Sequence, residues 1–359
     1  MNQIYLTVYY FLLVSFGFLL NYSKFNLDRF YSFFYIFNIF VLGVVILPNI
    51  DMLSRDFLNY YNWFMKIEKE GVSGFWDLKD PIFQYIVLFI QNVFGNSYFA
   101  IYMFFFICIS YCKLFFSKLM GLGSLYLILL WLLFGQTFIL YELTQIRAGF
   151  AISLCSYFIA RDIQKLDKIN LLFMLLSCFI HQSVFVLFLS YLLLRLSDNL
   201  FLSRNFTIFI YIMGLVSGLF LKPIFSNVVG LYFIGSERAK DYLDNSYSEI
   251  FEVSFLSVFY IAQSFVILFL SYFYLRLNDL QKKILFLSTL GSFFYSVFSF
   301  NSVLAYRFSE VFIFFTLVCM VFLLQLRVIN INFRQIWFLI LVALGVVFSY
   351  SSSKIILVN

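Results

Sequence analysis

Residues 122–160, LGSLYLILLWLLFGQTFILYELTQIRAGFAISLCSYFIA, decide the fold class of this chain. Two runs in this stretch, 122–140 and 148–160, are apolar and free of charge, and a short polar segment separates them. A transmembrane helix needs roughly 20 mainly apolar residues to cross about 30 Å of hydrocarbon. The two runs therefore predict successive membrane helices, with the polar segment where the chain turns between them.

The rest of the chain repeats this pattern. Of its 359 residues, 63% are hydrophobic and 12% are charged, whereas soluble domains carry about 25% charged residues. The first charge, Lys24, follows the first apolar run, so we expect a retained span rather than a cleaved signal peptide. Ten apolar runs are expected to cross the membrane as helices: 4–20, 30–49, 98–112, 122–140, 148–160, 206–221, 253–275, 284–300, 308–326 and 335–352.

Two further apolar segments do not fit simple crossings. Residues 81–94 are short and contain two glutamines, and residues 170–194 are interrupted midway at His181. Non-helical backbone at membrane depth is tolerated only where protein covers it or where it lines a wet cavity. We therefore expect an all-α polytopic membrane protein with about ten transmembrane helices, two re-entrant or interfacial segments and an outward-facing cavity.

The distribution of charge predicts the orientation in the membrane. If the two irregular segments do not cross, the inner loops hold 14 of the 24 Lys and Arg and 5 of the 18 acids, a net charge of +9, and the outer segments carry −3. This distribution of charge agrees with the positive-inside rule. If both irregular segments crossed fully, the loops between them would lie on the opposite side of the membrane. The predicted inner loops are 21–29, 113–121, 161–169, 195–205, 276–283 and 327–334.

The chain is then expected to form one integral membrane domain, 1–359, with both termini outside. Two long outer loops, 50–80 and 222–252, complete this map. The second of them contains SERAKDYLDNSYSEIFE, which is typical of an amphipathic surface helix or a lid.

Several classes of chemistry lack their sequence signals. There is no GxxxxGK[ST], GxGxxG, GxSxG or HExxH motif, which disfavours a nucleotide-driven or zinc enzyme. The net charge of +6 includes no basic run longer than two residues, so inner loops rather than nucleic acid account for it. All five cysteines lie in apolar stretches without a CxxC spacing and are expected to act as small hydrophobes. We expect no metal and no cofactor.

The polar segment between the two helices holds the strongest candidates for a site. An ionisable group at membrane depth costs about 2.5–3.5 kcal/mol on insertion scales, so it is a functional candidate by default. Glu142 and Gln145 share a helical face, and Arg147 precedes small residues that allow close helix approach. We expect the Arg147 side chain to point into the bundle; the alternative is an interfacial Arg that reaches water.

Three further polar residues can also be interpreted either as functional or as structural. His181, the one histidine of the chain, suits a general base at neutral pH, or a packing role at a helix break. Arg307 precedes Glu310 by three residues, so the two can form a simple helical ion pair. Alternatively, Arg307 is a second guanidinium in the cavity, where its planar fork suits phosphate oxygens.

The first outer loop offers carboxylates and aromatic side chains. Asp56 and Asp80 are candidates, because carboxylates beside a membrane surface rarely help packing. Tyr60, Tyr61 and Trp63 could form a sugar-binding rim, but an interfacial aromatic belt is the safer interpretation.

Together these segments resemble the EpsG family of Wzy-type polysaccharide polymerases. In that family an N/Q-x-R-x-G-small helix is followed by a basic cytoplasmic turn and an apolar segment that breaks at His-x-Ser. Residues 143–194 show this order, at Gln145, Arg147, Gly149, Ala151, His181 and Ser183. Weaker similarities are D-x-x-x-Y at Asp56 and Tyr60, Asp80-Pro81 where the family often has Glu-Pro, and Y-R-F at 306–308.

The resemblance implies a metal-independent glycosyltransferase in the bacterial cytoplasmic membrane. It would join oligosaccharide units carried on undecaprenyl diphosphate at the outer leaflet, for O-antigen, capsule or exopolysaccharide. A chain-length regulator and a flippase would be its partners. Arg147 and Arg307 would stabilise the diphosphate leaving group. The acceptor hydroxyl would lose its proton to Glu142 or His181, or to Asp80 or Asp56. Other substrate contacts would come from Gln145, Tyr60, Ser183 and Glu310.

Two other classes stay open. A transporter or flippase for the same lipid-linked sugar needs pathways to both faces and usually inverted repeats, and the sequence shows no repeat. A membrane acyltransferase or lipid-sugar ligase would want a histidine beside a carboxylate, and His181 has no acid near it in sequence.

Overall fold

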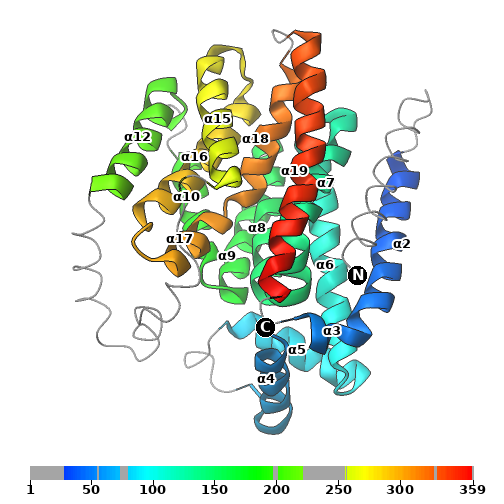
Figure 1. The fold of residues 1–359 in the computed structure, drawn as a ribbon. Coiled ribbons are helices and arrows are strands. Elements are labelled where there is room, and N and C mark those ends of the chain that lie inside the picture. The colour runs from blue at the N-terminus through cyan, green and yellow to red at the C-terminus, as the bar shows by residue number, and fades with distance from the viewer. Residues whose placement is uncertain are drawn as a thin grey trace. The chain divides into compact units, whose positions relative to one another are not determined.

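The computed structural model describes residues 28–54, 56–72, 80–196, 201–220, 255, 257–326 and 330–357, and within these ranges all regular structure is helical (Figure 1). The chain forms two compact units: unit 1 contains Met1–Phe188 and Leu324–Asn359, and unit 2 contains Leu189–Leu323. The predicted first span, 4–20, and the predicted lid, 222–252, lie outside the described residues.

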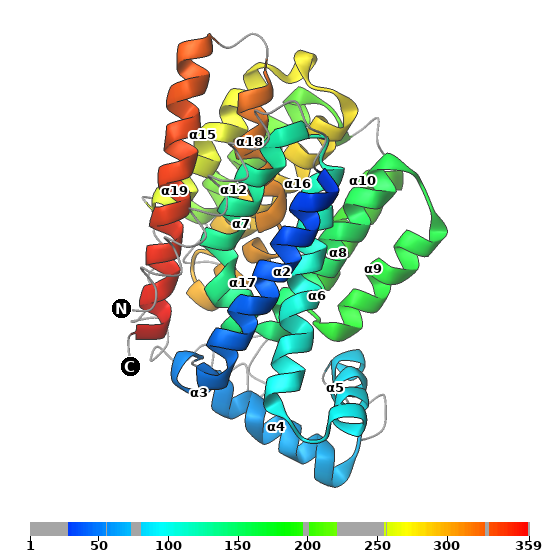
Figure 2. The same ribbon diagram turned by 90° about the vertical axis from the view of Figure 1, so that its right-hand side faces the viewer.

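Unit 1 is organised around two packed helices, α6 and α8. Helix α2 lies along α6, as Figure 2 shows, α9 packs on α8, and α19 packs on α7. The helices of unit 1 are α2 (Asp28–Ile46), η1 (Leu47–Asn49), α3 (Ile50–Leu53), α4 (Phe57–Glu70), α5 (Pro81–Phe94), α6 (Tyr98–Leu119), η3 (Gly123–Leu125), α7 (Tyr126–Thr137), the π-helix η4 (Phe138–Thr144), α8 (Ile146–Gln164), α9 (Lys168–Ile180) and α19 (Ile331–Leu357).

Unit 2 is organised around α16, which packs against α12, α15 and α17. A buried cluster of Tyr260, Tyr295 and Ala305 joins α15, α16 and α17. The helices of unit 2 are α12 (Arg204–Phe220), α15 (Val258–Tyr272), η5 (Tyr274–Arg276), α16 (Asp279–Val297) and α17 (Ser302–Glu310), and α10 (Val184–Leu196) and α18 (Ile313–Gln325) contain the two unit boundaries.

The described helices confirm a multi-pass membrane protein but not the predicted number of spans. Three helical stretches are long and apolar enough to cross a membrane, namely Tyr98–Leu119, Gly123–Thr144 and Ile331–Ser351. Val303–Glu310 and Ile313–Gln325, bent by 61°, form a fourth if they are one broken span. The other apolar helices have 10–17 residues, or about 15–26 Å at 1.5 Å per residue. Ten spans and an outward cavity therefore stay predictions.

One irregular segment is a short helix and the other is broken, whereas their re-entrant or interfacial placement stays a prediction. Residues 81–94 are the single short helix α5, and the segment 170–194 divides into α9 and α10 at residues 181–183. The predicted break at His181 is confirmed, since His181 has an extended backbone, with φ −154° and ψ 118°.

The predicted inner loop at 113–121 is wrong over most of its length. Helix α6 continues to Leu119, so Lys113 lies within the helix, and its side chain is buried. The apolar run 98–112 has 15 residues, about 23 Å of helix, which is too short for 30 Å of hydrocarbon. The helix can continue through Lys113 because a carboxylate from η4 neutralises the ammonium group.

The two ends of unit 1 differ in charge. At one end α6 and α8 finish and α9 begins, and the Gln164 side-chain amide donates a hydrogen bond to the Leu119 carbonyl. The opposite end carries the first residues of α5 and α8 and the last residues of α9. Basic residues gather at the first end: Lys118, Arg161, Lys165 and Lys168. The positive-inside rule predicts that this end faces the cytoplasm.

Candidate functional site

A buried ion pair joins two of the candidate residues in unit 1. The Asp80 carboxylate, 1% exposed, pairs with the Arg147 guanidinium in the first turn of α8. The second carboxylate oxygen of Asp80 accepts a hydrogen bond from the Gln182 backbone amide, with N and O 3.3 Å apart. Asp80 thus connects the start of α5, the start of α8 and the break between α9 and α10.

The backbone of Asp80 is unusual. Its φ of 58° and ψ of 62° lie in the left-handed region, immediately before Pro81 starts α5. Asp is one of the few residue types that enter this region, and such conformations persist where the surrounding structure enforces them, often at functional sites. Here the ion pair to Arg147 and the hydrogen bond from Gln182 hold the carboxylate inward.

Aromatic side chains of α4 surround the arginine. The Arg147 Cζ lies 5.1 Å from the centre of the Trp63 ring, a cation–π distance. Trp63 stacks on Tyr60 with ring centres 6.5 Å apart. Burial raises the pKa of the Tyr60 phenol to about 12; the Arg147 charge opposes this rise and the Asp56 charge adds to it. The phenol is therefore neutral at physiological pH.

Both rings pack near Arg147, a contact that the belt interpretation of Tyr60 and Trp63 did not include. Helix α4 buries Tyr60, Phe64 and Ile67, which share one helical face. Tyr61 projects elsewhere and is 39% exposed, as a belt residue would be. We name the set Asp80, Arg147, Trp63 and Tyr60 the arginine centre.

His181 and Ser183 flank the residue that contacts the arginine centre. The His181 amide caps α9 by donating to the Ser177 carbonyl, with N and O 3.2 Å apart. The next residue, Gln182, donates to Asp80. The side chains of His181 and Ser183 are both partly exposed. The fold thus brings the residue after His181 into contact with a carboxylate that is 102 positions earlier in the sequence.

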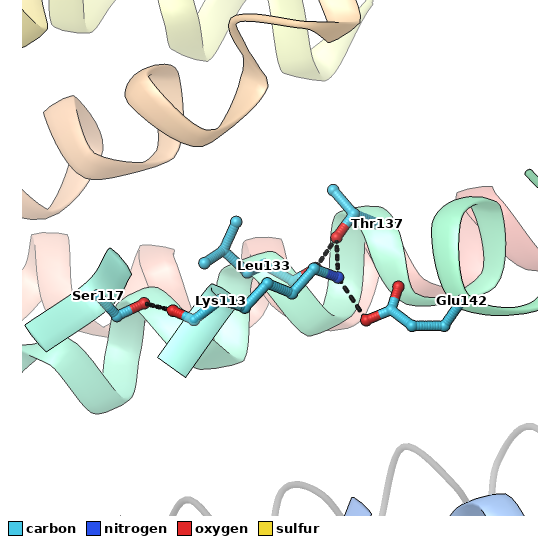
Figure 3. A network of polar contacts seen from close by, with 5 residues as sticks. All are labelled: Lys113, Ser117, Leu133, Thr137 and Glu142. Atoms are coloured by element: carbon cyan, nitrogen blue, oxygen red, sulfur yellow. Dashed lines mark hydrogen bonds and ion pairs between the residues drawn. The ribbon is translucent and has the colours of Figure 1, made fainter. Parts of the chain in front are cut away.

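Glu142 has its own partners, in a second buried network (Figure 3). The Lys113 ammonium lies 2.5 Å from the Glu142 carboxylate and donates a hydrogen bond of 2.5 Å to the Thr137 hydroxyl. Thr137 in turn donates to the Leu133 carbonyl, at 2.6 Å. Both charged side chains are 2% exposed. We name Lys113, Thr137 and Glu142 the lysine network.

Gln145 links the π-helix to α8. Its amide donates to the Leu140 carbonyl over 2.6 Å, and its carbonyl accepts from the Gly149 amide over 2.8 Å. The side chain is partly exposed. Gln145 therefore lies at the turn that precedes Arg147.

Arg307 and Glu310 belong to unit 2. Both are on α17, one helical turn apart, and Asn301 caps this helix with its side-chain oxygen 3.1 Å from the Leu304 amide. Arg307 is exposed and Glu310 is partly buried. Next to Arg307, the Tyr306 ring lies 5.7 Å from the ring of Tyr295.

Sequence reasoning did not select Lys113 as a site residue, and it did not predict that Trp63 contacts Arg147. Lys113 had a signal in the 15-residue apolar run before it, which cannot span a bilayer unless the helix continues. Trp63 had none beyond its place on the face that carries Tyr60, because pairing with Arg147 depends on the tertiary fold. Among the described residues, no group of three or more His, Cys, Asp or Glu side chains is placed to hold a metal ion.

Comparison with known proteins gives one match. Residues 50–356 match the family model described as EpsG family. Searches of curated proteins and of solved structures found no match. The matched range covers most of the chain and includes the arginine centre, the lysine network, His181 and α17. The chain therefore belongs to the EpsG family, the Wzy-like polymerase family.

Proposed function

We propose that this membrane protein joins oligosaccharide units carried on undecaprenyl diphosphate, at the outer leaflet of the bacterial cytoplasmic membrane. The product is an O-antigen, capsule or exopolysaccharide chain. One observation carries the proposal: a guanidinium held by a buried carboxylate and an aromatic face, at the end of unit 1 opposite its basic end. Such an arginine suits a diphosphate at the membrane surface.

The reaction needs two kinds of assistance. The bond between the donor sugar C1 and its diphosphate oxygen breaks, and a new C1–O bond forms to the acceptor hydroxyl. Negative charge develops on the leaving diphosphate, where Arg147 supplies a fixed positive charge and hydrogen-bond donors. Asp80 and Trp63 hold the guanidinium in one orientation, so little reorganisation is required as charge develops. This assistance requires no metal.

We propose His181 as the base that takes the proton of the acceptor hydroxyl. His181 is partly exposed, and the backbone amide of the next residue, Gln182, donates a hydrogen bond to the Asp80 carboxylate. Asp56 and Ser183 are substrate-binding candidates at the same end of unit 1. In unit 2, Arg307 is proposed as a phosphate ligand and Glu310 as a substrate-binding residue. A chain-length regulator and a flippase are the proposed protein partners.

The length profile of surface glycan tests this function. In a deletion strain we expect long chains to disappear while glycan of one repeat unit persists, and the wild-type gene should restore long chains. Loss of one-unit glycan as well would indicate a transporter. Unchanged length with altered acylation would indicate an acyltransferase. Either of these outcomes would overturn the proposal.

A further inference from the structure

The lysine network lies inside unit 1 and contacts the segment that leads into the arginine centre. Lys113 is on α6, whereas Thr137 and Glu142 are on the continuous α7–η4 stretch (Figure 3). Both charges are almost fully buried, at 2% exposure each. Burial of an ion pair is costly, and such pairs are best attested as devices that fix one arrangement among several.

The partner of Lys113 is part of a π-helix. Residues Phe138–Thr144 form η4, in which the Thr144 hydroxyl donates to the Ile139 carbonyl at 3.0 Å. The Gln145 amide donates five residues back, to Leu140, at 2.6 Å. π-Helices are rare and often occur at functional sites. Relaxation to an α-helix would rotate the downstream residues by roughly 100° about the axis, the angle of one residue.

The π-helix supports the first turn of α8 directly. A Cβ on Gly149 would lie 2.5 Å from the Tyr141 Cβ and 2.7 Å from the Tyr141 carbonyl oxygen. Helix α8 is thus packed against the backbone of the residue beside Glu142. Arg147 lies between this contact and the end of η4, so its direction depends on the register of the π-helix.

We propose that Lys113 and Glu142 are positioning residues: their buried ion pair holds the π-helix in the register that directs Arg147 to Asp80 and Trp63. This rests on the proposed function for its effect on activity, but not for its effect on geometry. Glu142 is then committed to Lys113 rather than acting as the base.

A cross-linking experiment tests the geometry without any activity. Cysteines replace Asp80 and Arg147 in a protein without its natural cysteines, and a short bifunctional methanethiosulfonate reagent links them. We expect the double change Lys113→Met with Glu142→Gln to reduce the cross-linked fraction at least threefold. The control double change Gln263→Leu with Thr316→Val removes a buried polar contact of 3.1 Å in unit 2 and should leave it unchanged. An unchanged fraction in the lysine-network variant overturns the proposal.

A turnover experiment on otherwise native protein tests the route through Arg147. We expect Lys113→Met with Glu142→Gln to lower kcat at least tenfold and to change KM less than threefold. In an Arg147→Lys background the same double change should lower kcat less than twofold, because the group being positioned is already altered. Equal losses in both backgrounds overturn the proposal.

Two further results separate folding from positioning. If the double variant does not accumulate, Glu142→Asp replaces it, since this variant keeps both charges and shortens the side chain by one methylene. A lower cross-linked fraction then supports the proposal, and an unchanged fraction overturns it. If Arg147→Lys has wild-type turnover, the proposed function of Arg147 fails, while the cross-linking result still decides the role of the lysine network.

Discussion

Arg147 is the residue whose chemistry is best defined by its neighbours. Its guanidinium pairs with Asp80 and lies over the Trp63 ring, two contacts that use a planar cation. Lysine has the charge but not the plane or the fork. We expect Arg147→Lys to reduce polymer formation by about 100-fold or more and Arg147→Ala to abolish it, in line with loss of a fixed electrostatic donor. Polymer formed in proteoliposomes from purified lipid-linked units is the measurement.

Arg161 provides the matched control on the same helix. It lies in the last turn of α8 and is exposed, at the opposite end of unit 1. Arg161→Lys should leave polymer formation within a factor of about two, as surface substitutions usually have small effects. Wild-type polymer from a normally abundant Arg147→Ala protein would refute the assignment.

His181 gives a prediction about pH. A base must be neutral to accept a proton, and imidazoles in reference peptides gain a proton as pH falls through about 6.5. If His181 is the base, turnover falls as the pH drops and His181→Gln is inactive at every pH, with normal abundance. Gln keeps hydrogen-bonding capacity but cannot take up the proton. Substantial turnover by His181→Gln, with an unchanged acid limb between about pH 5 and 8, would remove His181 from the catalytic residues.

At the scale of elements, the contact of α8 with the π-helix makes a prediction about stability. A methyl group on Gly149 would collide with the Tyr141 backbone, which cannot move alone. We expect Gly149→Ala to lower the free energy of unfolding by about 1–3 kcal/mol, as overpacking does, and to reduce polymer formation. Thermal unfolding in detergent measures the first effect.

Gly43 on α2 is the control for this change. A methyl group there would meet the Met103 sulfur at 2.7 Å, but that side chain is flexible and can move aside. Gly43→Ala should therefore be clearly less destabilising than Gly149→Ala. Equal destabilisation by the two changes would show that rigid packing on η4 is not what matters.

The elements also show how far sequence reasoning reaches. Apolar runs predicted most helices, and the interruption at His181 predicted the break between α9 and α10, because both signals are local. Asp80 and Gln182, by contrast, are 102 positions apart, and Lys113 and Glu142 are 29 apart. Their pairing depends on helix packing, which residue pattern alone does not specify. The π-helix has no sequence signal of its own, since the same residues suit an α-helix.

At the scale of the molecule, the map of sidedness underlies every functional proposal. Lys118, Arg161, Lys165 and Lys168 gather at one end of unit 1, and the arginine centre belongs to the opposite end. The positive-inside rule then predicts that the arginine centre lies toward the outer face, as the proposed polymerisation requires. An inverted map would leave the proposed chemistry on the wrong side of the membrane.

Single cysteines in a protein without its natural cysteines test this map, unit by unit. Glu70 ends α4 and Asp167 precedes α9 in unit 1; Tyr306 on α17 and Asp279 at the start of α16 serve unit 2. An impermeant maleimide in intact spheroplasts should label cysteines at Glu70 and Tyr306 and leave those at Asp167 and Asp279 unlabelled. Permeabilised cells supply the control, because all four positions should then react. In intact cells, labelling of the cysteine at Asp167 but not of the one at Glu70 would place the arginine centre at the cytoplasmic face, where polymerisation at the outer leaflet is impossible. Labelling at Asp279 but not at Tyr306 would invert the map of unit 2.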